Sequence, residues 1–201
     1  MNRYPAQFAT KRLILRPPSP NDAVGVLNAV TASYAELNRW MSWARTGFTI
    51  DEARQFCADA RLRFDKGEDF IALLILPNDQ KIIGCASLLA RDPRVPSFEL
   101  TYWLHTEFVG CGYVTEAART LTQFAFDNLA GRRVEIRMDG NNRRSWAVAK
   151  RLGFQWEATL KSYRRDNRGQ LSDWRIYAMF DGEDLTAGRT DSYLDRAAFE
   201  L

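Results

Sequence analysis

The chain has 201 residues, 46% of them hydrophobic and 12% aromatic, which is enough to bury one sizeable core, so one domain is expected. Its 28 lysines and arginines nearly balance its 25 aspartates and glutamates, which gives no indication of direct nucleic-acid binding; any basic patch is expected to be local. The longest apolar runs, such as FIALLIL, are far shorter than the roughly 20 residues that a membrane-spanning helix needs, so no membrane partner is expected.

The cysteines and the single histidine limit the kinds of chemistry. Cys57, Cys85 and Cys111 form an odd, scattered set without CxxC spacing, which fits a reducing compartment and neither a disulfide framework nor a zinc site. His105 is the only histidine, which argues against histidine-based metal sites and against Ser-His-Asp hydrolysis. The N-terminal segment MNRYPAQFATKR lacks the apolar stretch of a secretory signal. We therefore expect a cytoplasmic protein without a metal.

Hydrophobic periodicity predicts the elements of the first third of the chain. A polar start near Ser19–Asp22 opens a helix. Thr49 and Glu52 match a capping box, and the apolar residues after them recur at helical spacing up to Gly67. The expected elements are a strand (11–17), a helix (19–30), an aromatic, turn-rich segment (33–44) and a second helix (49–67).

The middle of the chain predicts three strands followed by a helix. The strands cover 70–76, 81–90 and 98–104, with PNDQ as a hairpin loop after the first and RDPRVPS, which has two prolines, as a loop after the second. The helix begins near Thr115 and ends at Gly131. One apolar stripe marks its buried face: Ala117, Ala118, Leu121, Phe124, Ala125 and Leu129.

The last third predicts a strand, a short helix and two more strands. RVEIRM (133–138) alternates apolar and polar residues and is a half-buried strand, and DGNNRR is a loop. SWAVAKRLGF is a helix that Gly153 closes, with Phe154 placed for a Schellman contact. RRDNRGQLSD separates two final strands, and a short helix is expected in SYLDRAAFEL. The second final strand is expected to direct four residues to one face: Trp174, Ile176, Ala178 and Phe180.

The order of these elements predicts a mixed α/β fold in a single domain that covers residues 1–201. The core of this domain is expected at about 11–181, followed by a polar C-terminal tail at 182–201.

Two glycines, Gly110 and Gly112, stand at the joint between a strand and a helix. A helix N-terminus offers unpaired N–H groups and roughly half a positive charge, and glycine lets a phosphate approach the backbone closely. A tight turn explains the pair equally well. The stretch lacks the Lys-Ser/Thr of a Walker loop and the third glycine of a dinucleotide fingerprint, which disfavours a nucleoside triphosphate site and a Rossmann site.

The segments VGCGYVTEA, NNRRSWAVAKRLGF and GQLSD occur in this order and resemble the GCN5-related N-acetyltransferase (GNAT) superfamily. Within it, the chain is most similar to the RimJ/RimL-type branch, which acetylates N-terminal amines of ribosomal proteins. The resemblance covers about Arg12 to Phe180. It implies a single-domain GNAT fold with a central, mixed, twisted sheet whose strands splay and are flanked by helices.

The resemblance also implies that acetyl-CoA is bound along the central strand and at the paired glycines. The backbone of residues 109–115 is expected to wrap the pyrophosphate, and the pantetheine arm is expected to pair with the end of the strand FELTYWL. Superfamily members often have Gln or Arg at the position of Val109 and Gly or Ala at that of Val114. Main-chain contacts should survive both changes. The expected acetyl-CoA-binding residues are Trp103, Leu104, Val109, Gly110, Cys111, Gly112, Tyr113, Val114, Thr115, Asn142 and Ser145.

Three side chains are implied as catalytic residues. Glu99 matches a carboxylate that deprotonates the amine, and a strand-end ion pair with an arginine is the alternative. Ser145 is implied to orient or protonate the leaving thiolate, whereas serine is also a favoured helix N-cap and Asn142 a favoured turn residue. Tyr113 is a second candidate acid, although tyrosine at this place in the branch often points into the core. The N–H near Leu104 is implied as the oxyanion donor.

The acceptor side is implied by the aromatic segment. Leu37, Trp40 and Trp43, with Tyr34 beside them, match a Leu-x-x-Trp-x-x-Trp element that lines the acceptor cleft in the RimL-type branch; a hydrophobic plug under a long loop is the alternative. The run KSYRRDNRG either gives the cleft rim a positive charge that favours an acidic peptide or forms a solvated hairpin tip.

The expected function is therefore transfer of an acetyl group from acetyl-CoA to the N-terminal α-amine of a protein, such as a ribosomal protein. An α-amine loses its proton at roughly 7.7–8.0 and lysine at about 10.4, so reaching the neutral form at pH 7 costs about 1 and about 5 kcal/mol respectively. A single, partly solvated glutamate suits the first acceptor better.

Two alternatives stay open. The first is a small-molecule amine acceptor: an aminoglycoside, a polyamine or an amino acid. A polyamine is disfavoured, because the stretch from Ser33 to Asp51 has only Glu36 and Asp51 as carboxylates. The second is a non-catalytic CoA-binding regulatory module, against which the joint presence of Glu99 and Ser145 argues. The oligomeric state is left open, a homodimer included.

Overall fold

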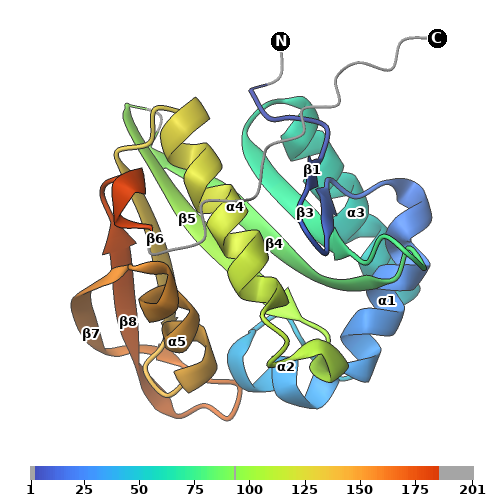
Figure 1. Cartoon of the computed structure of the whole chain (residues 1–201). Helices are drawn as coiled ribbons and strands as arrows, with labels where there is room; N and C mark the ends of the chain where they lie inside the picture. The colour runs from blue at the N-terminus through green and yellow to red at the C-terminus, as the bar shows by residue number, and fades with distance from the viewer. Residues whose placement is uncertain (1–2, 93, 186–201) are drawn as a thin grey trace, which may run out of the picture.

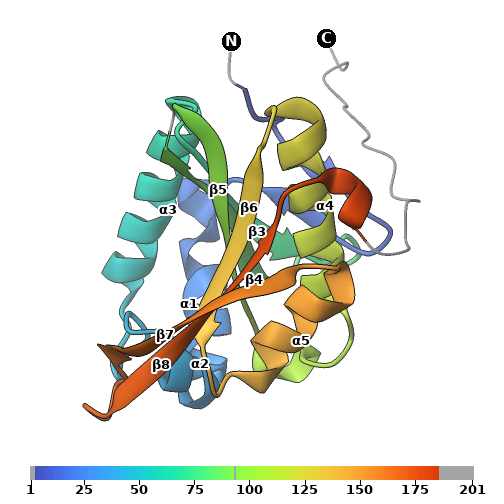
Figure 2. The ribbon, with the colours of Figure 1, turned by 90° about the vertical axis from the view of Figure 1, so that its left-hand side faces the viewer.

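Apolar runs along the chain pair into one eight-stranded sheet in the computed structural model, which describes residues 3–92 and 94–185 (Figure 1). The strands are β1 (Phe8–Ala9), β2 (Ile14–Arg16), β3 (Asp69–Ile75), β4 (Ile82–Asp92), β5 (Val95–Leu104), β6 (Arg133–Asp139), β7 (Gln155–Arg165) and β8 (Leu171–Met179). Their order is β1-β2-β3-β4-β5-β6-β8-β7, and the sheet twists along its length (Figure 2). All neighbours are antiparallel except β5 and β6. This mixed sheet confirms the predicted fold class.

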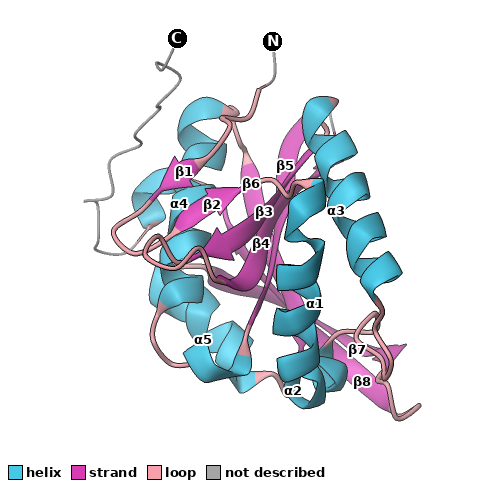
Figure 3. Ribbon diagram, turned by 90° about the vertical axis from the view of Figure 1, so that its right-hand side faces the viewer, coloured by secondary structure: helices cyan, strands magenta, loops and turns pink. Residues whose placement is uncertain are grey.

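Helices cover both faces of this sheet (Figure 3). They are α1 (Ala23–Ala32), α2 (Tyr34–Trp40), α3 (Ile50–Asp65), α4 (Tyr113–Asn128) and α5 (Arg143–Leu152), with short 3-10 helices η1 (Pro20–Asp22), η2 (Thr106–Phe108) and η3 (Gly182–Asp184). Because side chains alternate along a strand, β3 supplies Leu73 and Ile75 to the core under α1 and α3, and Ala72 and Leu74 to the core under α4. None of the helices in the described ranges is long and apolar enough to cross a membrane.

Several local signals in the sequence are confirmed. The Thr49–Glu52 capping box opens α3, and Thr49 Oγ1 accepts from Glu52 N. At the end of α5, Gly153 takes φ +96° and Phe154 N donates to Ala149 O (3.0 Å), which is the Schellman bond. The hairpin of β3 and β4 also follows the prediction.

The helix before the last two strands begins earlier than predicted. Arg143, not Ser145, is its first residue, because Asn142 is the N-cap and its side-chain oxygen accepts from Ser145 N (3.1 Å). At the end of α4 the left-handed residue is Ala130 (φ +51°). Gly131 is there for close approach, since a Cβ would lie 2.7 Å from the carbonyl oxygen of Ala125.

The loop predicted at 91–97 is wrong, because both strands extend into it. β4 runs to Asp92 and β5 starts at Val95. Asp92 faces both Pro96 and Ser97 at a register shift, and such a bulge tolerates the missing N–H of proline.

Two further predictions need correction, and a third holds for three of its four residues. The turn-rich segment 33–44 contains α2, and the first strand is only Ile14–Arg16, preceded by the two-residue β1 that periodicity cannot detect. On β8, Trp174, Ile176 and Ala178 share one face as predicted, whereas Phe180 follows the strand and is 50% exposed. Tyr177 and Met179, on the other face, belong to the core under α4. The helix predicted at 192–201 and the tail beyond Leu185 lie outside the described residues.

The strands β5 and β6 pair only over their first part. The pairs are Ser97 with Arg133, Phe98 with Val134 and Glu99 with Glu135. Beyond them β5 stays paired with β4 and β6 with β8, so the two strands part at their carboxyl ends. This confirms the predicted splay, and it opens the sheet where α4 begins.

Candidate active site

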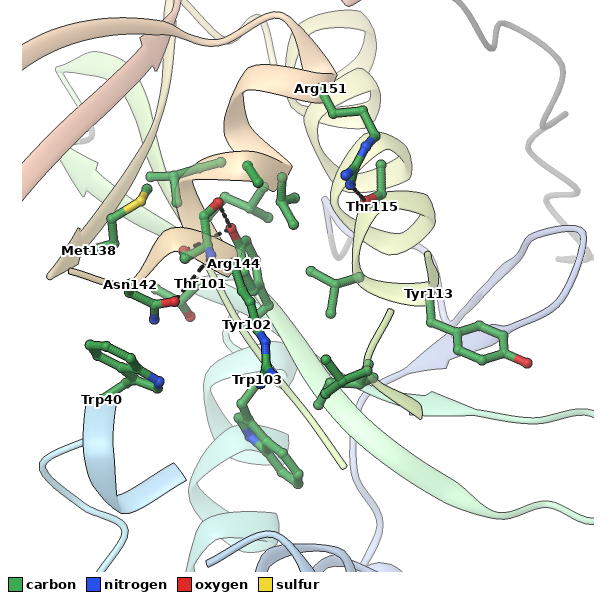
Figure 4. Close-up of a pocket in the computed structure, with 18 of the residues that line it drawn as sticks. Trp40, Thr101, Tyr102, Trp103, Tyr113, Thr115, Met138, Asn142, Arg144 and Arg151 are labelled. Carbon is green, nitrogen blue, oxygen red and sulfur yellow. Dashed lines mark hydrogen bonds between the residues drawn. The ribbon is translucent and has the colours of Figure 1, made fainter. Parts of the chain in front are cut away.

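A cavity of about 910 Å³ opens where β5 and β6 separate. It is lined by the carboxyl-terminal half of β5, the segment that leads into α4, the ends of β6 and α5 that face it, and α2 (Figure 4). Every residue that the sequence predicted to bind acetyl-CoA lines this cavity. The structure therefore brings together Trp103 and Leu104, the stretch 109–115, and Asn142 with Ser145.

The segment 109–115, called the cradle here, contains two glycines in the left-handed backbone conformation. Gly110 has φ +87° and Gly112 has φ +83°, a conformation that other residues rarely adopt. A Cβ on Gly110 would meet no atom within 4 Å, so the turn borders open space and is not covered by side chains. This openness is what a phosphate needs and what a tight turn packed into the core would lack.

The helix that follows presents to that space N–H groups that have no backbone partner in the part of the chain that the structure describes. Glu116 N donates to Gly112 O (3.0 Å) and is the first N–H of α4 with a carbonyl one turn before it. The N–H groups of Tyr113, Val114 and Thr115 therefore point out of the helix end, where the helix dipole favours an anion.

Cations from separate chain segments surround the cradle. Arg12 donates from Nη1 to Cys111 O (2.8 Å) and from Nε to Glu116 Oε2 (2.6 Å). Its guanidinium also lies 4.5 Å over the ring of Tyr113. Arg12 thus fixes the cradle from outside while adding a positive charge. Sequence reasoning missed this residue, which lies 99 positions from Cys111.

Three more cations line the same end of the cavity: Lys11, Arg119 and Arg151. Arg151 of α5 donates to Thr115 Oγ1 (3.1 Å), which ties α5 to the start of α4 (Figure 4). The cradle therefore has cations that only the fold assembles. Unpaired amides, open space and positive charge fit the diphosphate of the expected acetyl-CoA, and the unpaired edge of β5 fits its pantetheine arm.

Ser145 points its hydroxyl at a tyrosine that the sequence did not single out. The hydroxyl of Tyr102 lies 3.1 Å from Ser145 Oγ and 3.1 Å from Ser145 O. Surrounding protein screens this phenol from water and raises the pKa of Tyr102 to about 12, so it stays protonated at neutral pH. Asn142 performs the N-cap function that Ser145 was also suited to, which leaves the Ser145 hydroxyl for the cavity.

Glu99 occupies the last position at which β5 and β6 pair, and it lines the cavity. Arg91 donates to its Oε2 from Nε (3.0 Å) and from Nη2 (2.6 Å), so the ion pair that the sequence left as an alternative is present. Oε1 has no hydrogen-bond partner among the described residues. The arrangement thus leaves one carboxylate oxygen for a proton.

Arg137 is a second residue that the sequence did not reveal. It lines the cavity, donates from Nε to Glu135 Oε1 (2.6 Å) and lies 3.9 Å from Glu99 Oε2. The alternation of charges on one face of β6 is the signal that could have found it, because Arg133, Glu135 and Arg137 recur every second residue.

Tyr113 lies away from the other candidate catalytic groups. Its ring packs between Arg12 and Phe108, with 6.1 Å between the centroids of the two aromatic rings. Figure 4 shows its hydroxyl pointing away from Tyr102 and the end of α5. The geometry favours Ser145 over Tyr113 as a proton donor.

Of the four predicted acceptor-side residues, Leu37 and Trp40 line the cavity. Trp43 packs against Trp103 (6.0 Å between centroids), and the hydroxyl of Tyr34 accepts from Thr46 Oγ1 (2.7 Å); neither is a lining residue in the described structure.

We call the end of the cavity that Leu37 and Trp40 line the acceptor end, because the sequence predicts that these residues contact the acceptor. The hairpin of β7 and β8 lies beside this end. Asn167 at its tip donates from Nδ2 to Met41 O (3.0 Å), which holds the hairpin beside α2 (Figure 2). Trp174 of β8 lines the cavity, and Arg144 of α5 donates to Glu36 Oε1 (2.9 Å) across its mouth. The acceptor end is thus bounded by α2, α5 and this hairpin.

His105 has a structural place. It is buried, and its Nδ1 accepts from Glu107 N (3.2 Å) at the start of η2. Within the ranges 3–92 and 94–185, no group of three or more His, Cys, Asp and Glu side chains is placed to hold a metal ion.

Comparison with known proteins adds to this geometry. Residues 12–155 match the family model described as "Acetyltransferase (GNAT) domain". The chain is 29% identical over 152 residues to "Putative ribosomal N-acetyltransferase YdaF" of Bacillus subtilis, covering 75% of this chain and 82% of that protein.

Among solved structures, the fold is similar to "RimL- Ribosomal L7/L12 alpha-N-protein acetyltransferase in complex with Coenzyme A" (TM-score 0.81, 23% identity, 88% of this chain and 98% of that one). It is also similar to Mycobacterium smegmatis RimJ in complex with a CoA disulfide (TM-score 0.80, 22% identity, 92% of each chain).

Proposed function

Because the chain belongs to the GNAT acetyltransferase family and uses acetyl-CoA as its acyl donor, we propose that its acceptor is the N-terminal α-amine of a protein, such as a ribosomal protein. The observation that carries this proposal is the position of Glu99, Ser145 and the cradle around one cavity at the splay of β5 and β6. The similarity to YdaF and RimL, both described as ribosomal acetyltransferases, supports a ribosomal acceptor.

Acetyl-CoA supplies a thioester carbonyl for an amine to attack and a thiolate that leaves. The cradle amides of Tyr113 to Thr115 bind its diphosphate, and the free edge of β5 near Trp103 aligns the arm that ends in the thioester. The backbone N–H near Leu104 faces the developing oxyanion. These contacts are made by main-chain groups, so the departures at Val109 and Val114 are compatible with binding.

Glu99 accepts the proton that the amine releases, at Oε1. Its other oxygen is held by Arg91, which keeps the carboxylate in one orientation. An α-amine needs about 1 kcal/mol to reach its neutral form at pH 7, against about 5 for lysine, so a single base that is 13% exposed is matched to the α-amine.

The Ser145 hydroxyl donates a proton to the leaving sulfur, and Tyr102 positions that hydroxyl. The single phenolic proton of Tyr102 can go either to Ser145 O or to Ser145 Oγ. When Tyr102 donates to Oγ, the serine proton is free to point into the cavity. Tyr102 itself stays protonated because its pKa is raised to about 12, so it acts as a fixed donor and not as the source of the proton.

The acceptor end of the cavity suits a polypeptide better than a polyamine. Its apolar walls come from Leu37, Trp40 and Trp174. Glu36 is paired with Arg144 and Glu99 with Arg91, and Asp139 accepts hydrogen bonds from Asn141 N and Ser172 Oγ. A polycation would therefore find no pair of unengaged carboxylates among these residues.

A panel of acceptors tests this proposal. Acetyl-CoA consumption is measured with a peptide that has a free N-terminus, the same peptide with a blocked N-terminus and an internal lysine, spermidine, and an aminoglycoside. We expect turnover with the first alone, with mass spectrometry placing the acetyl group on the α-amine. Equal turnover with the lysine peptide or a small amine would refute the α-amine assignment.

A further inference from the structure

The positive charge of the chain is concentrated in one stretch beside the acceptor end. Between Asn141 and Arg175 there are nine lysines and arginines and three aspartates and glutamates, whereas the whole chain has 28 and 25. Outside this stretch acidic residues therefore outnumber basic ones. The stretch forms α5 and the β7–β8 hairpin, two of the three elements that bound the acceptor end of the cavity.

Five arginines of this stretch form what we call the basic rim: Arg143, Arg144, Arg164, Arg168 and Arg175. All are exposed except Arg175, which is half-buried. Arg144 pairs with Glu36, but the other four have no carboxylate within ion-pair distance in the ranges that the structure describes.

The acidic groups nearest along the chain are already engaged. Asp173 binds Lys161 Nζ (2.7 Å) and Ser162 N (2.9 Å), and Asp166 accepts from the backbone N–H of Arg168 and Gln170 inside the hairpin turn. The rim thus has an excess of positive charge that the protein does not neutralise.

The rim is continuous with the cavity. Arg144 and Trp174 line the cavity, and the guanidinium of Arg164 lies 4.6 Å over the ring of Trp174, just outside it. The bond from Asn167 to Met41 O fixes the hairpin against α2, so the rim is held in place. A polypeptide whose first residue reaches Glu99 from this end has its following residues at the rim.

We propose that the basic rim binds acidic residues of the acceptor polypeptide, a few positions after its N-terminus, and so selects acceptors with an acidic N-terminal segment. This inference rests on the proposed α-amine acceptor and adds a specificity to it. Arginines with excess positive charge near a cavity mouth attract an acidic chain over a Debye length, about 8–10 Å at physiological salt, and mainly raise the rate of productive encounter.

An acidic polypeptide is a better occupant of the rim than RNA, because the proposed reaction in the cavity needs an N-terminal amine. The rim adjoins the cavity through Arg144, which lines it, and Arg164, which lies over the lining residue Trp174. Glu99 and Ser145 line the same cavity, and only a polypeptide has an N-terminal amine to bring there. RNA bound at the rim would block the entrance, and this alternative is one of the outcomes of the test.

The test compares three peptides that share their first two residues and have Asp, Asn or Lys at the third to sixth positions. At low salt we expect kcat/KM to rank Asp above Asn above Lys, with about tenfold or more between the extremes, because electrostatic steering changes association rates by about 10–10³-fold. At 0.5 M NaCl the ranking should shrink to within about twofold.

Matched charge reversals locate the effect. Arg143→Glu with Arg168→Glu alters two rim residues whose side chains bond to no cavity-lining residue in the described structure, and it should abolish or invert the preference. Arg54→Glu with Arg61→Glu makes the same change in net charge on exposed positions of α3 and should retain the wild-type ranking. Thermal melts of both variants verify folding.

The outcomes separate this inference from the proposed function. Equal kcat/KM for all three peptides at low salt overturns the acidic preference while α-amine acetylation stands. If no peptide is acetylated but a small amine is, the proposed function itself fails. If a short RNA oligonucleotide inhibits while the peptides show no ranking, the rim is a nucleic-acid surface and the inference is overturned.

Discussion

Glu99 shows how two interpretations of one residue can both describe the molecule. A glutamate at the start of a strand is suited to an ion pair with a neighbouring arginine or to proton abstraction in a cleft. In the structure Arg91 holds one oxygen while the residue lines the cavity, so the ion pair orients the carboxylate that we propose as the base. The sequence could suggest both roles, but only the fold shows that they are compatible.

Glu99→Gln should lower kcat/KM for an N-terminal peptide about 10²-fold or more, since general base catalysis contributes about 10²–10⁴-fold. Affinity for acetyl-CoA, measured by calorimetry, should stay within about twofold of wild type. The deficit should shrink as the pH rises through about 8, because more of the α-amine is then already neutral.

Glu107→Gln is the matched control for this change. Glu107 is 71% exposed on η2 and does not line the cavity, so the variant should keep full turnover. Wild-type rates in Glu99→Gln would remove Glu99 from the mechanism without affecting the fold.

Tyr102 and Ser145 should behave as a unit. Ser145→Ala removes the proposed proton donor, and Tyr102→Phe removes the group that orients it, so each should lower kcat about tenfold or more with KM for acetyl-CoA little changed. Because the pKa of Tyr102 is raised to about 12, its effect should be constant between about pH 6 and 9.

A double-mutant cycle on these two residues separates positioning from structure. In the Ser145→Ala background, Tyr102→Phe should have almost no further effect on kcat. Independent, multiplicative losses would mean that Tyr102 acts through packing or through its contact with the Ser145 carbonyl oxygen, not through the hydroxyl.

At the scale of elements, the sequence correctly predicted the helix ends and the hairpin that depend on neighbouring residues. Capping at Thr49, the Schellman end at Gly153 and the β3–β4 hairpin depend on residues within a few positions of one another. Where the sequence was wrong, a distant partner or a competing cap decided the result. Asn142, not Ser145, is the N-cap of α5. Pro96 lies in β5 because it faces Asp92 of β4 and its carbonyl oxygen accepts from Arg132 N, next to β6.

Gly110 of the cradle and Gly84 of β4 should respond differently to alanine. Gly110→Ala has room for its Cβ but must hold φ +87°, which costs about 1–2 kcal/mol, so the cradle should shift and the Kd of acetyl-CoA should rise about fivefold to thirtyfold. Calorimetry measures the affinity, and a thermal melt should show only a small loss of stability.

Gly84→Ala is the structural counterpart. Its Cβ would lie 2.4 Å from Trp103 O, so β4 and β5 must move apart, at a cost of about 1–3 kcal/mol and a Tm lower by roughly 2–4 °C per kcal/mol. If Gly110→Ala lost as much Tm as Gly84→Ala and bound acetyl-CoA normally, the cradle would be only a tight turn.

The thiols provide a separate probe of the cradle. Cys57 and Cys85 are buried, and burial raises the pKa of these thiols to about 11 and about 12, whereas Cys111 is exposed between the two cradle glycines. In the native protein a thiol reagent such as DTNB should therefore modify one cysteine quickly, and all three after denaturation.

Acetyl-CoA has no free thiol, so it does not itself react with the reagent. If the cradle binds acetyl-CoA, the modification of Cys111 should become slower. Cys111→Ser should remove the fast phase and serves as the control. Rapid modification of two or three thiols in the native protein, or no protection by acetyl-CoA, would contradict the description of this segment.

At the scale of the whole molecule, the site is assembled from parts of the chain that no local pattern connects. Arg12 precedes the second strand, the cradle lies about a hundred residues later, and Arg151 belongs to α5, yet all line one end of the cavity. The motif order predicted the fold and the glycine cradle. The cations, Tyr102 and Arg137 became visible only when the sheet order brought their elements together.

The sheet topology is compatible with our proposal that the two substrates enter from different sides. The parallel strands β5 and β6 separate after Glu99. The cradle lies on the side of α4, and α2, α5 and the β7–β8 hairpin lie on the other side. We propose that the chemistry takes place between them, where Glu99 and Ser145 both line the cavity. The basic rim, of whose arginines only Arg144 has an ion-pair partner among the described residues, lies on the side that we propose for the acceptor.

The most direct test of this account is a calorimetric titration of the wild-type protein with coenzyme A and, separately, with acetyl-pantetheine, which keeps the pantetheine arm but lacks the diphosphate and the 3′-phosphoadenosine. We predict that coenzyme A binds and that acetyl-pantetheine binds at least about 10²-fold more weakly, because two or more charge-assisted bonds of about 1.5–3 kcal/mol each are lost. Equal affinity for the two molecules, or no binding of coenzyme A, would contradict the claim that the open main-chain amides of the cradle hold the diphosphate.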